Sequence, residues 1–103
     1  MATCIWTGKS GTKYEYTIYA IDTTWNDVAG NYIFAKQLPS GLWEALYIGQ
    51  TDSFANRLPN HEALPCVRRN GGTHVHAHTN TNKEARLAEE KDLLDNHNPP
   101  CNG

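Results

Sequence analysis

Alternating apolar and polar positions predict four strands. In residues 13–21 a period of two places Tyr14, Tyr16 and Ile18 on one face. Short runs rich in β-branched and aromatic residues recur further along the chain. The predicted strands are residues 13–21, 31–36, 43–49 and 73–79. The Leu-Pro-Ser-Gly sequence at 38–41 is typical of a turn, so the second and third strands should form a hairpin.

Two helices are predicted after the hairpin. Thr51-Asp52-Ser53 supplies N-cap side chains for a helix over 53–60, which Pro59 should interrupt because proline lacks an N–H. A capping box formed by Thr81 and Glu84 opens a second helix over 82–96.

The segments between and after these helices complete the picture. Residues 63–72 are predicted to be irregular, and Asn98-Pro99-Pro100 ends the last helix. The order of elements predicts a single domain over residues 1–103, of mixed α/β (α+β) class, with short strands in a sheet flanked by helices.

Composition narrows the class of protein. The chain has 103 residues, with 39% hydrophobic and 19% charged positions, which is ordinary for one globular domain. No apolar run approaches the roughly 20 residues that span a bilayer, so no membrane partner is expected. The formal net charge of -2 means that any nucleic-acid role needs a local basic patch, a bound metal or a partner.

The cysteines predict the compartment. Cys4, Cys66 and Cys101 are odd in number and form no C-x-x-C pair, and no secretory signal is visible at the N-terminus. Reduced thiols in a cytoplasmic protein fit this pattern best.

One carboxylate of the last helix falls on its apolar side. Leu87, Leu93 and Leu94 bracket an apolar arc, and Glu90 lies in its middle. Three other acidic residues lie away from this arc and should need only solvent: Glu89, Asp92 and Asp95. An inward carboxylate needs an ion pair, a groove that reaches water, or a cation. Arg57 is a candidate partner for such a pair.

Three histidines alternate along the last predicted strand. His74, His76 and His78 should share one face, with Val75 and Ala77 on the other. We interpret Val75 and Ala77 as core residues and the histidines as facing solvent or a partner. A zinc site completed by Cys66 or His97 is the weaker alternative. With Arg68 and Arg69, the histidines could instead supply a positive patch.

A series of motifs resembles the GIY-YIG nuclease superfamily. The paired tripeptides are Gly30-Asn31-Tyr32 and Tyr47-Ile48-Gly49, followed by Arg57, His61 and Glu90. The closing pattern also matches, with Leu93-Leu94, Pro99 and Asn102. The resemblance covers residues 30–102. Three positions depart from the family pattern: Asn31, Gln50 and Pro59.

The resemblance implies a fold and a set of roles. The fold would be a small central three-stranded antiparallel sheet flanked by helices, with the N-terminal region 1–29 contributing an extra strand at the sheet edge. Glu90 would hold one Mg²⁺ or Mn²⁺ ion, and Arg57 would bind a phosphate oxygen. Tyr32 or His61 would be the general base, with Tyr47 beside them. The supporting residues would be Gly49 and Asn102. Independently of the resemblance, the charges of Arg68 and Arg69 make them further candidates for substrate contacts.

These observations predict a small divalent-metal-dependent endonuclease that hydrolyses DNA, with a protein partner or a structural feature of DNA giving specificity. The alternative is a family member with weak or no cleavage that serves as a binding module. The nuclease requires five residues to converge on one concave face: Tyr32, Tyr47, Arg57, His61 and Glu90. A Glu90 separated from Tyr32 by the sheet would exclude it.

Overall fold

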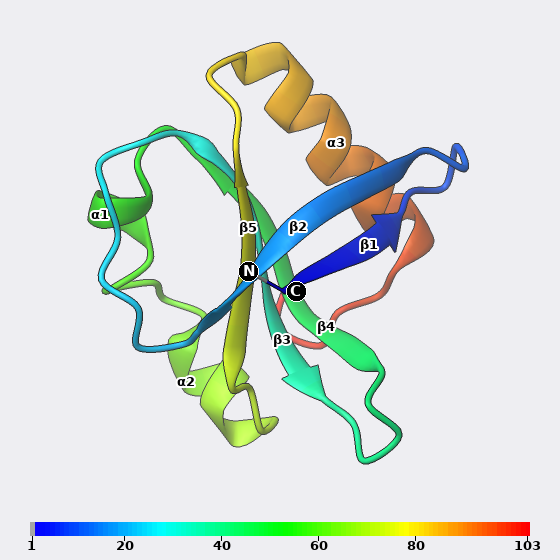
Figure 1. The fold of residues 1–103 in the computed structure, drawn as a ribbon, viewed down its shortest axis with the longest axis vertical. Coiled ribbons are helices and arrows are strands. Elements are labelled where there is room, and N and C mark those ends of the chain that lie inside the picture. The colour runs from blue at the N-terminus through cyan, green and yellow to red at the C-terminus, as the bar shows by residue number, and fades with distance from the viewer. Residues whose placement is uncertain (1) are drawn as a thin grey trace.

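The computed structural model describes residues 2–103 and contains five strands and three helices (Figure 1). The strands are β1 (Thr3–Thr7), β2 (Lys13–Ala20), β3 (Gly30–Gln37), β4 (Trp43–Thr51) and β5 (His74–Thr79). The helices are α1 (Phe54–Arg57), α2 (Leu64–Arg69) and α3 (Lys83–Asn96). All strand pairs are antiparallel, and the order across the sheet is β1-β2-β5-β3-β4.

The four predicted strands are confirmed, but the sheet is larger than expected. β2 pairs with β5 on one side and with β1 on the other, so β1 and β4 are the edges. The sequence analysis missed β1 because only Trp6 of this edge strand is buried, while Ile5 is 51% exposed. The sheet is therefore a curled, five-stranded half-barrel rather than three strands with one addition.

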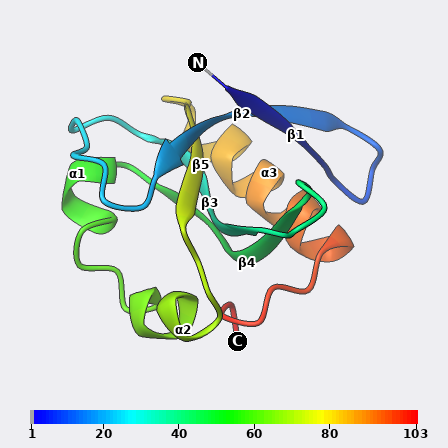
Figure 2. The ribbon, with the colours of Figure 1, turned by 60° about the horizontal axis from the view of Figure 1, so that its bottom comes forward.

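Helices cover both faces of the curled sheet (Figure 2). α3 lies inside the curl against β1, β3 and β4, while α1 and α2 pack on the other face. The inner layer joins Ile33 and Ile48 to Leu93 of α3, and the outer layer joins Phe34 to Phe54 and Val67. Because both faces are covered, the first six residues of β3 are all buried.

The segment after β4 forms two short helices instead of one. Ser53 caps α1 as predicted, accepting a hydrogen bond from the Asn56 backbone N–H at 3.2 Å. The helix ends at Arg57, ahead of Pro59, rather than at residue 60. α2 occupies part of the segment predicted to be irregular, because proline is tolerated in its first turn and Leu64 and Val67 bury against the core.

α3 turns a different face to the sheet than predicted. Arg86, Glu89 and Leu93 are its buried residues, whereas Leu87 is 43% exposed. Glu89, expected to be solvated, accepts hydrogen bonds from Tyr16 Oη and from His78 Nε2, the latter at 2.6 Å. The face of α3 that packs on the sheet is therefore set by the hydrogen bonds of Glu89 to β2 and β5, and not by the leucines that the apolar periodicity placed inward.

The start of α3 also differs from the prediction. Its N-cap is Asn82, whose side chain accepts a hydrogen bond from the Ala85 N–H at 2.9 Å. Thr81 lies one residue before this cap, so the expected capping box with Glu84 does not open the helix.

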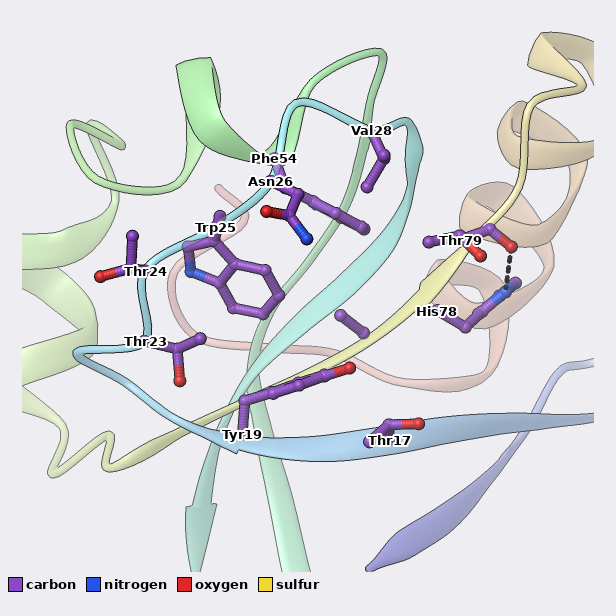
Figure 3. Close-up of a pocket in the computed structure, with 11 residues that line it drawn as sticks. Thr17, Tyr19, Thr23, Thr24, Trp25, Asn26, Val28, Phe54, His78 and Thr79 are labelled. Atoms are coloured by element: carbon purple, nitrogen blue, oxygen red, sulfur yellow. Dashed lines mark hydrogen bonds between the residues drawn. The ribbon is translucent and has the colours of Figure 1, made fainter. Parts of the chain in front are cut away.

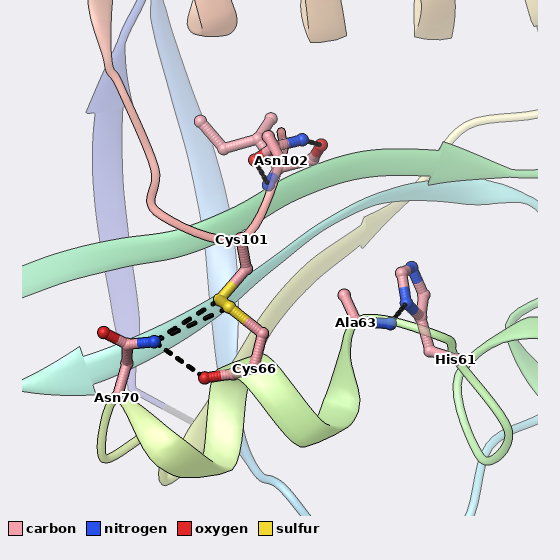
Figure 4. Close-up of a disulfide and its surroundings, with 7 residues drawn as sticks. His61, Ala63, Cys66, Asn70, Cys101 and Asn102 are labelled. Atoms are coloured by element: carbon pink, nitrogen blue, oxygen red, sulfur yellow. Dashed lines mark hydrogen bonds between the residues drawn. A yellow bond between two sulfur atoms is a disulfide. The ribbon is translucent and has the colours of Figure 1, made fainter.

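A disulfide joins Cys66 of α2 to Cys101 near the C-terminus, with 5.8 Å between the two Cα atoms (Figure 4). The prediction of three reduced thiols is therefore wrong, and Cys4 alone is a free thiol. The argument from reduced cysteines to a cytoplasmic location loses its basis. Over residues 2–103, no helix is long and apolar enough to cross a membrane.

Candidate functional site

Four of the five residues expected to form the site lie together on the outer face of the sheet. Tyr32 of β3 and Tyr47 of β4 stack with ring centroids 6.0 Å apart, and the His61 ring packs edge-on against both. Tyr32 Oη lies 2.7 Å from His61 Nε2. A Cβ atom on Gly49 would approach Tyr32 Oη to 2.7 Å, so this position must be glycine for the Tyr32 ring to lie here.

His61 is held as a neutral hydrogen-bond donor. Its Nδ1 accepts the Ala63 backbone N–H at 3.0 Å, so the proton of the neutral ring is on Nε2 and is donated to Tyr32 Oη. Burial, together with the nearby Arg57 charge, lowers the pKa of His61 to about 4. Both ring nitrogens of His61 are hydrogen-bonded, and the Nδ1 lone pair already accepts the Ala63 backbone N–H. His61 therefore positions Tyr32 and is not available as a general base.

Tyr32 is fully buried and protonated at neutral pH. Burial is the main cause that raises the pKa of Tyr32, with the Tyr47 hydroxyl adding to it and the Arg57 charge opposing it. A phenol with a pKa above its usual range is not a base in the free protein. Its hydroxyl can still orient a water molecule through hydrogen bonds.

Arg57, the last residue of α1, binds an oxyanion within the chain. Its guanidinium donates to both carboxylate oxygens of Glu62, with the Nη2–Oε1 contact at 2.8 Å. This ion pair lowers the pKa of Glu62 to about 2. The Arg57 side chain is one-third exposed, so an incoming phosphate could replace the carboxylate in the same bidentate geometry.

Glu90 reaches the site from the other layer of the fold. It lies on α3, which packs inside the curl, so the five residues do not share one concave face as predicted. β4 is an edge strand, however, and the Gln50 backbone N–H points to the Glu90 carboxylate. Tyr32 Oη lies against Gly49, the residue before Gln50, so Tyr32 and Glu90 lie in different layers on either side of β4, the arrangement that was expected to count against the nuclease. Only their charges interact across this edge strand. The Glu90 charge accordingly contributes to the raised pKa of Tyr32.

Glu90 is a half-buried carboxylate without a cation. Burial raises its pKa above the usual value, and in residues 2–103 no Lys, Arg or His lies within ion-pair distance of it. The described residues contain no group of three His, Cys, Asp or Glu side chains that could hold a metal ion. A single carboxylate completed by water and substrate oxygens suits Mg²⁺ or Mn²⁺, so the donor present at this edge fits such an ion.

The chain's C-terminus fixes the backbone beside Gly49 (Figure 4). Asn102 Oδ1 accepts the Ile48 N–H at 2.8 Å, and Asn102 Nδ2 donates to the Ile48 carbonyl at 2.9 Å. Cys101 N–H donates to the Leu46 carbonyl at 2.9 Å. The last residues thus cover part of the β4 edge at Leu46 and Ile48, and Gln50 beyond them is half-buried.

Sequence reasoning missed Arg86. This residue is 3% exposed, and its Nε donates to Gln50 Oε1 at 3.1 Å while Nη1 donates to the Asn80 carbonyl at 2.9 Å. Its position four residues before Glu90 places both on one side of α3. That spacing was a usable signal, because a cation one turn from an inward carboxylate belongs to the same surface.

The other basic residues and histidines are not part of this cluster. Arg68 and Arg69 are exposed on α2. His76 is fully buried and accepts the Trp6 indole N–H at Nδ1, which contradicts the interpretation that the histidines face solvent. His78 is bound to Glu89 and is only partly exposed. Val75 and Ala77 are in the core, as predicted.

A cavity of about 300 Å³ lies between β2, β5 and the loop after β2 (Figure 3). Trp25, Tyr19 and Phe54 form its aromatic wall, and threonines and Asn26 supply polar groups. Phe54 separates this cavity from Tyr32, with ring centroids of those two residues 6.4 Å apart. The residues before β3 therefore build a hollow next to the cluster but outside it.

Comparison with known proteins adds no relative: no family model, curated protein or solved structure matches the chain.

Proposed function

We propose that the protein is a small divalent-metal-dependent endonuclease that hydrolyses phosphodiester bonds in DNA. The observation that carries this proposal is the cluster of Tyr32, His61 and Arg57 on the outer face, with the charge of Glu90 acting on the pKa of Tyr32 from the other layer. Phosphodiester hydrolysis needs an oriented water, a cationic clamp on the phosphate and stabilisation of developing charge. One group of each kind is present here.

Each residue has a distinct role in this proposal. Arg57 releases Glu62 and binds two phosphate oxygens of the substrate. Tyr32, held by the His61 Nε2–H, orients the attacking water, and Tyr47 stacks against it to fix the ring. A Mg²⁺ or Mn²⁺ ion bound by Glu90 would supply Lewis-acid stabilisation of the phosphate and the leaving oxygen.

We further infer that β3, β4 and β5 with the three helices form a GIY-YIG-type core, and that β1 and β2 extend it. The support is the order of the tripeptides on β3 and β4, with Arg57 on the next helix and Glu90 on the last. In this proposal a protein partner or a distorted DNA structure sets the specificity.

The test is nicking of supercoiled and branched DNA in Mn²⁺ by wild type, Glu90→Gln and Glu84→Gln. Glu84 is exposed in the first turn of α3, so its variant changes the net charge equally without touching the site. We expect nicking by wild type and Glu84→Gln, and at least a roughly hundredfold loss in Glu90→Gln. Tyr32→Phe, which keeps the ring, should lose activity too.

Two results would contradict the proposal. Absence of nicking by the wild type in both Mg²⁺ and Mn²⁺ is one. Equal nicking by wild type and Glu90→Gln is the other, because it would point to a contaminating nuclease.

A binding module of GIY-YIG fold with weak or no cleavage, acting with a nucleic-acid or protein partner, is the second candidate. The Arg57–Glu62 ion pair favours it, because the fork that would clamp the phosphate is already occupied, and the net charge is -2. This candidate predicts binding of branched DNA without nicking, and unchanged affinity in Glu90→Gln measured in EDTA.

A further inference from the structure

The edge of β4 holds a buried cation with no anionic partner. Arg86 is 3% exposed, and its two acceptors, the Gln50 side-chain oxygen and the Asn80 carbonyl, are both neutral. In the described chain no carboxylate lies within ion-pair distance of Arg86. A buried charge without a counter-ion is costly, so this arrangement favours an anion from outside.

Arg86 also opens onto a hollow. A cavity of about 250 Å³ is lined by Gln50, Thr51, Asp52, Lys83 and Arg86. Arg86 uses Nε and Nη1 in its two hydrogen bonds, which leaves Nη2 without a partner. In residues 2–103 the buried side-chain atoms without a partner are Asn31 Oδ1 and His76 Nε2. Nη2 is not among them, so it is accessible from the hollow. Arg86 and Lys83 outweigh the single carboxylate of Asp52, which is exposed and pairs with neither.

We propose that Arg86 and Lys83 form a phosphate-binding subsite for the nucleotide adjacent to the one that is cleaved. Gln50 connects the two positions, since its side chain contacts Arg86 and its backbone N–H points to Glu90. Arg86 and Glu90 are one helical turn apart, about 5–6 Å between their Cβ atoms. A strand that places one phosphate beside Glu90 can therefore place its neighbour at Arg86.

This inference rests on the proposed DNA substrate, and it supplies the local positive patch that a chain of net charge -2 requires. It also gives Gln50 a purpose: a neutral side chain positions the guanidinium and leaves its charge free for substrate.

The decisive variant is Gln50→Glu. Gln50 Oε1 already accepts from Arg86 Nε at 3.1 Å, so a glutamate here gives Arg86 an internal counter-ion with almost no change in shape. We expect folding stability to be kept or raised while DNA binding falls about tenfold at 0.1 M salt, the effect of losing one phosphate contact. The matched control is Gln37→Glu, an exposed position at the opposite end of β3.

A second pair of variants makes the test independent of Arg86 folding. Lys83→Gln should weaken binding and reduce the slope of log K against log salt by about 0.9. Lys91→Gln removes the same charge from α3, but Lys91 is exposed and paired with Asp95. It should bind like the wild type.

Binding is measured by fluorescence anisotropy of a labelled DNA duplex of about 20 bp in EDTA, between about 50 and 200 mM salt. Equal affinities for Gln50→Glu and Gln37→Glu, or for Lys83→Gln and Lys91→Gln, would overturn the subsite even if the wild type nicks DNA. If Gln50→Glu and Lys83→Gln both lose DNA binding while the wild type never nicks DNA, the phosphate-binding subsite is supported and the nuclease proposal is overturned.

Discussion

Arg57 is the residue whose state decides whether the site can accept a phosphate. Its guanidinium is fully engaged by Glu62, and the pair lies at the surface, with the Glu62 side chain 72% exposed. Exposed ion pairs contribute little free energy because water and salt compete for both partners. Glu62 therefore acts as a weak internal competitor for the substrate rather than as a structural lock.

Glu62→Gln should for this reason increase activity. We expect kcat/KM for nicking to rise about two- to fivefold, the range for releasing an exposed ion pair. Asp95→Asn is the control, because Asp95 is an exposed partner of Lys91 on α3 and its loss changes the net charge equally. A lower rate in Glu62→Gln, or an equal rise in Asp95→Asn, would show that Glu62 does not compete for Arg57.

Among the elements, α2 and the C-terminal turn depend on each other through the disulfide. Cys66 and Cys101 are 35 residues apart in sequence, and Asn70 donates from Nδ2 to the Cys66 carbonyl at 2.8 Å beside the bridge. The bridge anchors the turn from which Asn102 holds Ile48 on β4. Closing a loop of this length restricts the unfolded chain substantially.

Removing the bridge should therefore lower the stability of the whole domain. Cys66→Ser is expected to reduce the free energy of unfolding by about 3 to 4 kcal/mol, measured by urea denaturation. Cys4→Ser removes the free thiol and should leave the midpoint unchanged. The role assigned to the bridge would be wrong if both variants unfolded at the wild-type midpoint.

The sequence predicted an element where its pattern is local, and failed where the element depends on contacts between residues far apart in the chain. β3 and β4 were predicted because their apolar runs and the Pro-Gly turn between them are contiguous. The inward face of α3 was not predicted, because Glu89 turns inward only where Tyr16 and His78, which lie on β2 and β5, provide hydrogen-bond donors. The disulfide likewise depends on two segments whose proximity no spacing rule reveals.

The candidate site divides in the same way. Its residues on β3, β4 and α1 were found because the tripeptides and Arg57 follow each other within one supersecondary unit. Glu90 lies in the other layer because α3 packs against the inner face of the sheet. This packing depends on the strand order, which the sequence motifs do not show. Arg86 was missed although its spacing from Glu90 was a usable signal, because only its burial beside Gln50 shows that this cation turns inward.

At the scale of the whole molecule, both faces of the sheet bury a neutral histidine. His61 is enclosed in the outer layer, and His76 in the inner one, where Trp6 Nε1–H donates to its Nδ1 at 2.9 Å. Burial is the main cause in each case and lowers the pKa of both residues to about 4. His78 behaves oppositely, because its hydrogen bond to the Glu89 carboxylate raises its pKa above 6.5.

These pKa shifts predict that the free energy of unfolding is greatest close to neutral pH. Between about pH 6.5 and pH 4 the unfolded chain binds protons on His61 and His76 that the folded protein does not, so stability falls on acidification. The stabilising contribution of His78 is complete below pH 6.5 and is lost as the pH rises through its folded pKa. The raised pKa of Glu90 opposes the acid loss, since the folded state holds that proton more tightly.

The measurement is urea unfolding from pH 4.5 to pH 8.5. We expect the unfolding free energy to fall by about 1.4 to 2.7 kcal/mol per pH unit near pH 5.5, the slope for one to two protons. His78→Gln should keep that acid slope while losing the decline on the alkaline side, because His78 alone among these histidines has a raised pKa. A stability that stays constant or increases from pH 6.5 to pH 5 would mean that His61 and His76 are not held neutral by the fold. The tautomer that lets His61 donate to Tyr32 would then be wrong as well.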